Sequence, residues 1–314
     1  MIKKVIIDCD TGTDDAIALL SGLLTKELDI RAITTVAGNA ELAETARNTL
    51  DLVRFLGNDV RVAKGSTKPI FRDLQKIRSV DIHGKNGLGD VEIQESNADF
   101  AVTNAVETIR DEARQGDLEL ISIGPLTNIA HAIMVFPELS TLVKRITFMG
   151  GAIKGGNVTE VAEFNVCADP EAAKIVLRSG IPLTMVGLDV TERVVLNKED
   201  YKVIKGLTSK EGQIAAAILE FMFKRARNGG EGAVMHDALA LASVVKPTLL
   251  RTHRYFVDVE TQGEYTCGYT FVDKKNITNN KPNCNVAIDV DIDGFKDWLL
   301  TTLRSQEKHA HSIL

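Results

Sequence analysis

The stretch Val5-Ile6-Ile7-Asp8-Cys9-Asp10-Thr11-Gly12-Thr13-Asp14-Asp15 decides the fold. Its β-branched start predicts a short buried strand, Gly12 allows a tight turn, and a helix follows from Asp15. The same unit then repeats, with apolar strand-like runs at residues 30–36, 60–63, 118–123, 143–149 and 181–188 and helical patterns at residues 43–56, 100–115, 128–135 and 170–179. This alternation predicts an α/β fold with a mostly parallel, doubly wound central sheet and helices on both faces.

Three later segments complete the prediction. Residues 196–223 look all-helical and are expected to lie on top of the sheet, and the polar residues 276–285 are expected to form a loop. Phe164 alternates with Glu163 and Asn165 like a residue of an edge strand. No linker, low-complexity tract or repeat interrupts the sequence, so residues 1–314 are expected to form a single domain.

Composition excludes several classes of function. The 314 residues include 37 Lys and Arg against 43 Asp and Glu, a net charge of −6 without a basic run, which argues against nucleic acid or an anionic membrane as a partner. No apolar run is long enough for a signal peptide or a membrane span. The cysteines are too widely spaced for a disulfide framework or a CxxC metal site: Cys9, Cys167, Cys267 and Cys284. We therefore expect a cytoplasmic protein with reduced thiols.

Polar residues follow the predicted strands where each strand ends. In open α/β sheets, ligands bind beyond these carboxyl ends. The residues concerned are Asp8, Asp10, Asp14 and Asp15 after the first strand, Asn39 after the second, the Ile123 carbonyl before Gly124-Pro125, and Met149, Asn157, Glu163 and Asn165 after the run 143–149. His236 and Asp237 precede a further apolar helix. The sheet should gather these segments along one edge.

The acidic cluster carries the strongest chemical signal. Four carboxylates within eight residues repel one another unless a divalent ion lies among them, their pKa values rise, or their side chains point apart. Oxygen ligands of this kind suit Ca²⁺ or Mg²⁺ better than zinc. Alternatively, Asp14 and Asp15 only stabilise a helix amino terminus, and Asp237 does the same at its own helix. His83, in Asp81-Ile82-His83-Gly84, is equally consistent with an ordinary loop residue.

At this point the sequence resembles the inosine-uridine-preferring nucleoside hydrolases. Asp8-Cys9-Asp10-Thr11-Gly12-Thr13-Asp14-Asp15-Ala16 is similar to their DTDPGxDDA signature, with Cys9 and Thr11 in place of Thr and Pro. Other motifs match in order along the whole chain: Gly38-Asn39, His83-Gly84, Gly124-Pro125-Leu126-Thr127-Asn128, Met149-Gly150-Gly151-Ala152, Gly156-Asn157-Val158-Thr159, Glu163-Phe164-Asn165 and Met235-His236-Asp237-Ala238-Leu239.

The resemblance implies hydrolysis of the N-glycosidic bond of ribonucleosides, of purine or pyrimidine type, to ribose and free base in nucleoside salvage. It also implies a bound Ca²⁺ and a homodimer or homotetramer. The implied calcium ligands are Asp10, Asp15, the Ile123 carbonyl and Asp237, and the implied ribose contacts are Asp14, Asn39, Met149, Asn157, Glu163 and Asn165. Asp10 would be the general base, and His236, with His83 nearby, would face the nucleobase.

This sequence departs from the family pattern where the base is bound. Relatives often carry Tyr or Gln in the helix before the Met-His-Asp motif, whereas residues 221–228 read Phe-Met-Phe-Lys-Arg-Ala-Arg-Asn. Lys224 or Asn228 are candidates to replace them, or the base contact is apolar. Cys267 stands where the family usually has Arg. Base preference therefore stays open on the sequence alone.

Two other functions compete with this interpretation. Asp8-Cys9-Asp10-Thr11 also resembles the DxDxT loop of haloacid-dehalogenase-type phosphatases, in which Asp8 would be the nucleophile and Asp10 the acid. That chemistry needs a downstream Lys and acidic pair, which Glu163-Phe164-Asn165 and His236-Asp237 do not supply. The second alternative is a non-catalytic calcium- or sugar-binding homologue that has kept the fold.

Overall fold

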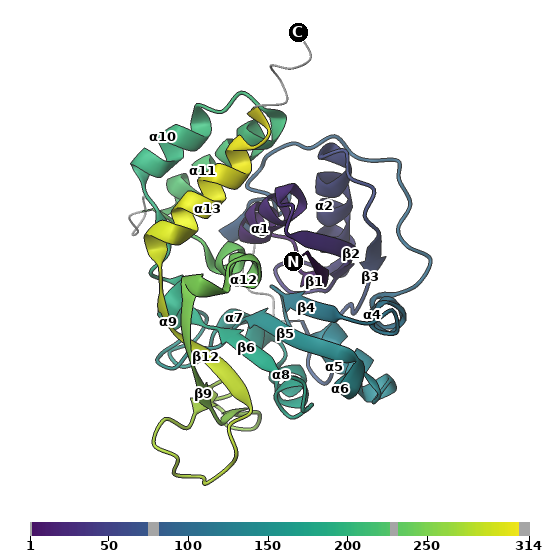
Figure 1. The fold of residues 1–314 in the computed structure, drawn as a ribbon, viewed down its shortest axis with the longest axis vertical. Helices are drawn as coiled ribbons and strands as arrows, with labels where there is room; N and C mark the ends of the chain where they lie inside the picture. The colour runs from purple at the N-terminus through teal and green to yellow at the C-terminus, as the bar shows by residue number, and fades with distance from the viewer. Residues whose placement is uncertain (1, 75–81, 227–231, 308–314) are drawn as a thin grey trace.

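An eight-stranded sheet forms the centre of the molecule, and the computed structural model describes residues 2–74, 82–226 and 232–307. The strands are, in spatial order, β3 (Val62–Lys64), β2 (Leu28–Thr35), β1 (Lys3–Cys9), β4 (Leu118–Ser122), β5 (Val143–Met149), β6 (Leu183–Val186), β12 (Cys284–Val290) and β9 (Leu250–Tyr255). All neighbours pair in parallel except β12 and β9, which pair antiparallel (Figure 1). This confirms the predicted mostly parallel sheet.

Helices connect these strands. They are α1 (Thr13–Leu24), α2 (Leu42–Phe55), α4 (Ala105–Ala113), α5 (Thr127–Val135), α6 (Leu139–Leu142), α7 (Phe164–Ala168), α8 (Pro170–Leu177), α9 (Leu188–Thr191), α10 (Lys198–Lys205), α11 (Lys210–Ala226), α12 (His236–Val245) and α13 (Ile292–Arg304). Two small antiparallel pairs lie outside the main sheet, β7 (Val195–Leu196) with β8 (Ala233–Val234) and β10 (Val257–Val259) with β11 (Thr270–Val272).

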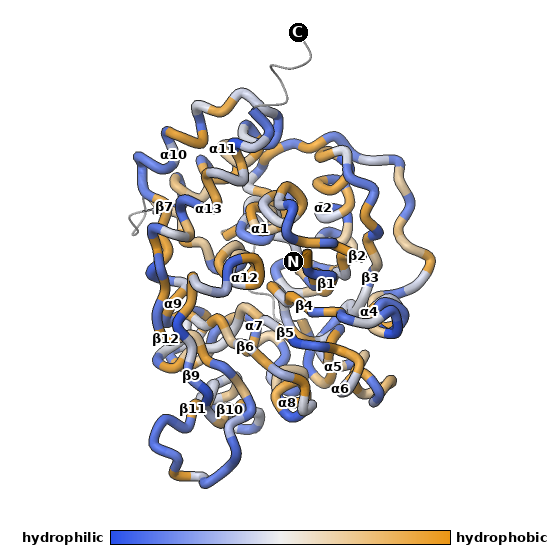
Figure 2. Tube along the Cα trace, viewed as in Figure 1, coloured by the Kyte–Doolittle hydropathy of each residue, from blue (hydrophilic) through white to orange (hydrophobic). Residues whose placement is uncertain are grey.

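The sheet separates two apolar cores because strand side chains alternate between its faces. In β1, Val5 and Ile7 pack into one core and Ile6 into the other. The first core includes side chains of α1, α2, α11, α12 and α13, and the second includes side chains of α4, α5 and α8. Figure 1 shows α1, α12 and α13 on one side of the sheet and α4, α5 and α8 on the other. In Figure 2 the central strands are mostly hydrophobic, whereas the loop between β11 and β12 is hydrophilic.

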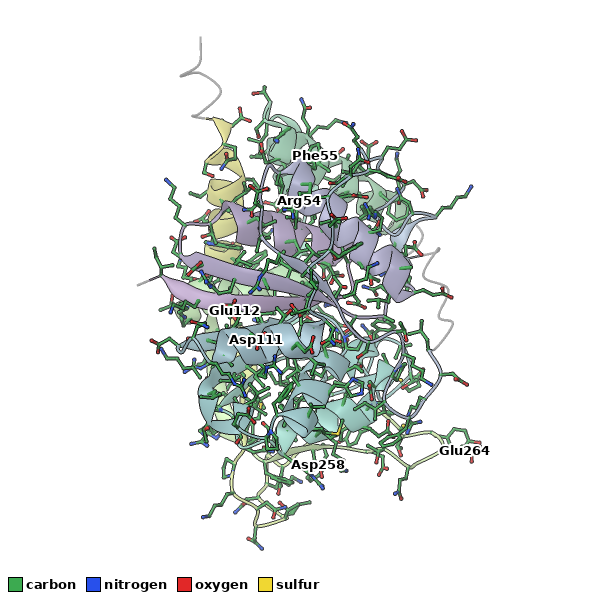
Figure 3. The ribbon with its side chains drawn as sticks, turned by 90° about the vertical axis from the view of Figure 1, so that its right-hand side faces the viewer. Arg54, Phe55, Asp111, Glu112, Asp258 and Glu264 are labelled. Carbon is green, nitrogen blue, oxygen red and sulfur yellow. The ribbon has the colours of Figure 1, made fainter. Side chains whose placement is uncertain are left out.

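Charged contacts fix α4 on the outer side of its core. Glu112, labelled in Figure 3, lies near the end of α4 and accepts a hydrogen bond from Arg31 of β2 at 3.1 Å and another from Arg61. The helix begins at Ala105, so the prediction of a helix from Phe100 was wrong at its start. Asn104 accounts for the difference, because its side chain caps α4 by accepting a hydrogen bond from the Glu107 N–H.

Two other sequence predictions need correction. The predicted edge strand around Phe164 is instead the short helix α7, capped by Glu163. The predicted all-helical segment 196–223 contains two helices, α10 and α11, which are separated at residues 206–209, and its first residue belongs to β7. The predicted loop at 276–285 is confirmed up to Cys284, where β12 begins.

The strand order places a ligand-binding edge at β1 and β4. From β1 the chain adds β2 and then β3 on one side, whereas β4 lies on the other side of β1. The direction in which strands are added to the sheet therefore reverses between the parallel strands β1 and β4. In doubly wound sheets, ligands bind at the carboxyl ends of the strands at such a reversal. Asp10 follows β1 and Ile123 follows β4, so both lie at this position. No helix within the described ranges is long and apolar enough to cross a bilayer.

Candidate active site

A cavity of about 530 Å³ opens at this edge of the sheet. Ten of the predicted site residues line it: Asp14, Asn39, His83, Ile123, Met149, Asn157, Glu163, Asn165, His236 and Asp237. The other two, Asp10 and Asp15, are fully buried and contact the lining residue Asn39. The structure therefore brings together the twelve residues predicted as metal ligands, ribose contacts or catalytic groups, although they come from segments more than 200 positions apart.

Asp15 is held by donors at the start of α1. Its Oδ1 accepts a hydrogen bond from the Asp10 N–H at 3.2 Å, and its Oδ2 accepts from the Gly12 N–H at 3.0 Å and from Asn39 Nδ2 at 3.1 Å. Burial nevertheless raises the pKa of Asp15 to about 6. The alternative of a helix-terminal acid is thus partly correct for Asp15, which accepts from the N–H of Gly12, the residue that caps α1.

Asp10 is packed on both sides by glycines. Its Oδ2 accepts a hydrogen bond from the Asn39 N–H at 2.7 Å, while its Oδ1 is buried and has no hydrogen-bond partner among the described residues. A Cβ atom built on Gly124 would lie 2.6 Å from Oδ1, and one on Gly38 would overlap Oδ2. Burial and the charge of Asp15 raise the pKa of Asp10 well above its usual range. The site therefore fits an Asp10 carboxylate that contacts something beyond the protein's own donors.

Asp14 joins α1 to the start of α12. Its Oδ2 accepts hydrogen bonds from the backbone N–H groups of His236 at 2.8 Å and Asp237 at 3.0 Å, while its Oδ1 is buried and has no partner within the described ranges. Burial, followed by the charges of Asp14 and Asp15, raises the pKa of Asp237 well above its usual range. Burial also raises the pKa of Asp14 to about 7.

Glu163 and Asn165 organise the opposite wall. Glu163 caps α7, accepting hydrogen bonds from the N–H groups of Asn165 and Gly151 at 2.9 Å and of Val166 at 3.1 Å. Burial raises its pKa to about 7. Asn165 Nδ2 donates to the Ile123 carbonyl at 3.0 Å and to the Met149 carbonyl at 3.2 Å. The side chain of Asn165 therefore links the ends of β4 and β5.

The acidic residues fit a hard cation by their chemistry. The pKa values of these carboxyls rise mainly through burial and through one another's charge, and two of their oxygens, on Asp10 and Asp14, have no partner within the described residues. A divalent cation held by these oxygens would offset the repulsion among the carboxylates and would give the two oxygens a partner. Among the described residues, however, no three His, Cys, Asp or Glu side chains are already grouped to hold a metal ion. The ligand set Asp10, Asp15, Ile123 and Asp237 stays a prediction.

The remainder of the cavity is lined by two imidazoles and by apolar side chains. His83 Nδ1 accepts a hydrogen bond from the Thr13 N–H at 3.1 Å, and His236 Nδ1 lies 2.8 Å from Thr191 Oγ1. Burial lowers the pKa of both imidazoles to about 4, and the nearby charge of Arg225 adds to this effect. Ile82, Met222 and Val234 line the same region.

Arg225 is the residue that sequence reasoning missed. Of the two proposed substitutes for the family's Tyr or Gln, Lys224 pairs with Glu220 at 3.2 Å and its side chain is 64% exposed, and Asn228 lies outside the described residues. Arg225 lines the cavity instead. Helical spacing could have found it, because Arg225 follows the buried Met222 by three positions and so shares its face of α11.

The position of Asp8 argues against the phosphatase reading. Asp8 is 1% exposed, does not line the cavity, and accepts hydrogen bonds through Oδ1 from Thr34 Oγ1 and from Asn128 Nδ2 at 2.8 Å. A phosphatase nucleophile must reach a phosphorus atom in the cavity. The side chain of Asp8 instead connects β1 to Thr34 of β2 and Asn128 of α5, and Cys267 also lies outside the set of residues that line the cavity.

Comparison with known proteins agrees with this geometry. Residues 5–297 match the family model described as inosine-uridine preferring nucleoside hydrolase. The pyrimidine-specific ribonucleoside hydrolases RihA of Escherichia coli and Citrobacter koseri are both 41% identical, over 97% and 96% of this chain and 99% and 98% of theirs.

Solved structures show the same relationship. A purine-preferring ribonucleoside hydrolase from Gardnerella vaginalis has a TM-score of 0.92 at 35% identity, covering 98% of this chain and 99% of its own. A plant nucleoside hydrolase has a TM-score of 0.92 at 29% identity, covering 96% of this chain and 99% of its own. The chain therefore belongs to the inosine-uridine preferring nucleoside hydrolase family.

Proposed function

We propose that this chain hydrolyses the N-glycosidic bond of ribonucleosides and releases ribose and the free base. The observation that carries this proposal is the composition of the cavity. Polar groups that follow β1, β2, β4 and β5, including the buried Asp14, Glu163 and Asn165, share it with two imidazoles and an arginine. The family membership supports the same reaction.

The polar residues match the charges of such a reaction. When the glycosidic bond breaks, positive charge grows on the sugar, and carboxylates such as Asp14 and Glu163 stabilise it. The attacking water must lose a proton, and Asp10 is the proposed base because its Oδ1 has no other partner among the described residues. Asn39, Asn157 and Asn165 are proposed to orient the ribose hydroxyls. His236, with His83, is proposed to face the base.

We propose Ca²⁺ as the metal, held by Asp10, Asp15, the Ile123 carbonyl and Asp237. When bound, it would supply a positive charge that orients hydroxyl groups and offsets the repulsion among the carboxylates. The support for this proposal is the donor set, which consists of oxygens only, and the two buried oxygens without partners within the described ranges.

The relatives differ in the bases that their names state, pyrimidine for the RihA proteins and purine for the Gardnerella enzyme. Because the RihA proteins are 41% identical to this chain and the Gardnerella enzyme 35%, we propose pyrimidine ribonucleosides as the preferred substrates.

The decisive experiment measures reducing sugar released from inosine, adenosine, guanosine, uridine and cytidine, with and without a calcium chelator. We expect ribose from uridine or cytidine and its loss on chelation. Asp10→Ala should lower kcat by at least 10³-fold, about the scale of losing a catalytic base. Asp59→Ala, which removes a fully exposed carboxylate, is the matched control and should retain wild-type kcat.

Two outcomes would favour the alternatives. Ribose released from none of the five nucleosides, in the presence of calcium, would favour a non-catalytic binding protein. Phosphate released from p-nitrophenyl phosphate, and lost in Asp8→Asn, would favour a phosphatase.

The quaternary structure and the cellular location stay predictions as well. The family resemblance implies a homodimer or homotetramer, which light scattering on the purified protein would distinguish from a monomer. Cell fractionation would test the cytoplasmic location, which is expected from the wide spacing of the cysteines in the sequence.

A further inference from the structure

We propose that Arg225 is a catalytic residue that stabilises the departing base, by donating hydrogen bonds from its guanidinium to the exocyclic oxygen next to the glycosidic nitrogen of a pyrimidine. This inference rests on the proposed function and deepens it, because it names the side chain that stabilises the negative charge on the departing base. The residues implied by family resemblance at this part of the cavity were His83 and His236.

The first argument is the position of Arg225. It lies on the last turn of α11, is exposed at the rim, and lines the same cavity as His83 and His236. Among the described residues that line the cavity, it is the only Lys or Arg. Its charge acts on both imidazoles and on Asp14, so the guanidinium is close to the groups proposed to hold the nucleoside.

The second argument is that one donor of the Arg225 guanidinium is bonded within the protein while its other donors have no acceptor among the described residues. Arg225 Nη1 donates a hydrogen bond to the Ile82 carbonyl at 2.6 Å, which ties α11 to the segment that carries His83. Within the described ranges, no carboxylate lies within 4.0 Å of this guanidinium and no acceptor engages its Nε or Nη2. Arginine presents several donors in a fixed plane, so one edge can be anchored while another binds a ligand oxygen.

The surroundings favour a flat, weakly polar ligand beside the arginine. Ile82 is 38% exposed although it is apolar, and Met222 of α11, which is 2% exposed, lines the same cavity. Apolar side chains around one charged group are typical of sites that bind a ring and orient it by a single polar contact. A nucleobase bound here would cover Ile82 and exclude water from the guanidinium.

The chemistry of the bond explains why a cation helps. The C1′–N1 bond breaks, its electron pair moves to the base, and the charge spreads onto O2 of the pyrimidine. The water oxygen forms the new bond to C1′ and its proton goes to Asp10, and the base anion takes up a proton from solvent after release. Arginine does not lose its proton at neutral pH, so Arg225 acts by charge-assisted hydrogen bonds and not as an acid.

The test compares a poor leaving group with a good one. Uracil leaves as a basic anion, whereas p-nitrophenolate from p-nitrophenyl β-D-ribofuranoside needs little stabilisation. We expect Arg225→Met to lower kcat for uridine by at least about 10-fold, less than for a fully buried donor because Arg225 is exposed. The same variant should change hydrolysis of the nitrophenyl riboside by less than about 3-fold. 5-Fluorouridine, which has a more acidic base, should show an intermediate loss.

Lys224→Met is the matched control, since it removes a cation from the adjacent position whose side chain is 64% exposed and paired with Glu220. It should leave both substrates unaffected. Partial rescue of Arg225→Ala on uridine by millimolar guanidinium, without an effect on the nitrophenyl riboside, would further support the assignment. Thermal melting of each variant separates misfolding from a local effect.

Two results would overturn the inference while leaving the proposed function intact. One is an equal loss on uridine and the nitrophenyl riboside in a folded Arg225→Met, and the other is wild-type activity on uridine. If the wild-type protein released ribose from neither substrate, the proposed function itself would fail.

Discussion

Gly124→Ala is a one-carbon change that should displace Asp10 without altering any polar group. The added Cβ would lie 2.6 Å from Asp10 Oδ1 and 3.0 Å from its Cγ and backbone N. Ordinary contacts of this kind begin near 3.4 Å, so the carboxylate must withdraw by about 0.8 Å, or the loop after β4 must shift by a similar amount.

A displacement of this size has a predictable kinetic cost. Misplacing a reacting group by about 1 Å lowers a rate by up to roughly 100-fold, so we expect kcat for uridine to fall about 10- to 100-fold. Overpacking in a tight site costs about 1–3 kcal/mol, so the variant should still fold but melt at a lower temperature. Ribose release under saturating substrate gives kcat, and circular dichroism gives the melting temperature.

Gly206→Ala is the matched control, because its Cβ would meet only two carbonyl oxygens, at 3.4 and 3.5 Å, and its φ of −79° suits alanine. This variant should retain wild-type kcat and be as stable as the wild type or slightly more so. Wild-type kcat in a folded Gly124→Ala, with calcium present, would refute the reasoning, since it would mean that the position of Asp10 does not limit the reaction.

Three further predictions concern stability and metal binding. Asn128→Ala removes hydrogen bonds to Asp8 Oδ1, the Thr35 carbonyl and the Ser66 N–H, and should cost about 3 kcal/mol in urea unfolding; a loss below 0.5 kcal/mol would contradict it. Because the pKa of Glu163 is raised to about 7 in the folded state, its protonation favours folding below pH 4.5 and this benefit is lost as the pH rises through 7. In chelator, the free energy of unfolding of the wild type should therefore fall by about 3 kcal/mol relative to that of Glu163→Gln between pH 4 and pH 8. The same pH dependence of this free energy in both proteins would exclude the effect. Calcium at 100 times its dissociation constant should stabilise the wild type by about 2.7 kcal/mol but not Asp10→Ala, as differential scanning calorimetry can measure; equal shifts in both would place the ion elsewhere.

The gathering of the site could be predicted from sequence because it depends only on topology. Asp10, Ile123 and Met149 each end or follow an apolar run, and parallel strands bring such ends to one edge. The strand 143–149 was predicted with its observed bounds, since Gly150 and Gly151 mark its end clearly.

What the sequence did not predict depends on contacts made across the fold. The helix α7 has five residues, too few for a periodic pattern, and forms where Glu163 caps it while also accepting the distant Gly151 N–H. Helical spacing indicates that Arg225 shares a face of α11 with Met222, but the contact that anchors it beside the cavity is a hydrogen bond to Ile82, 143 positions earlier in the chain. Local patterns carry no information about such pairs.

The arrangement of charge in the cavity also bears on how the proposed reaction gains its rate. A nucleoside such as uridine is neutral, so fixed charges bind it only weakly in the ground state. In the transition state proposed above, the sugar would become positive beside Asp14 and Glu163, and the base would become negative beside Arg225, since all three residues line the cavity. Interactions that grow only as the bond breaks lower the barrier without tightening substrate binding. Loss of either charge should therefore appear mainly in kcat, and a variant of Arg225 that changed only KM would point to simple base binding.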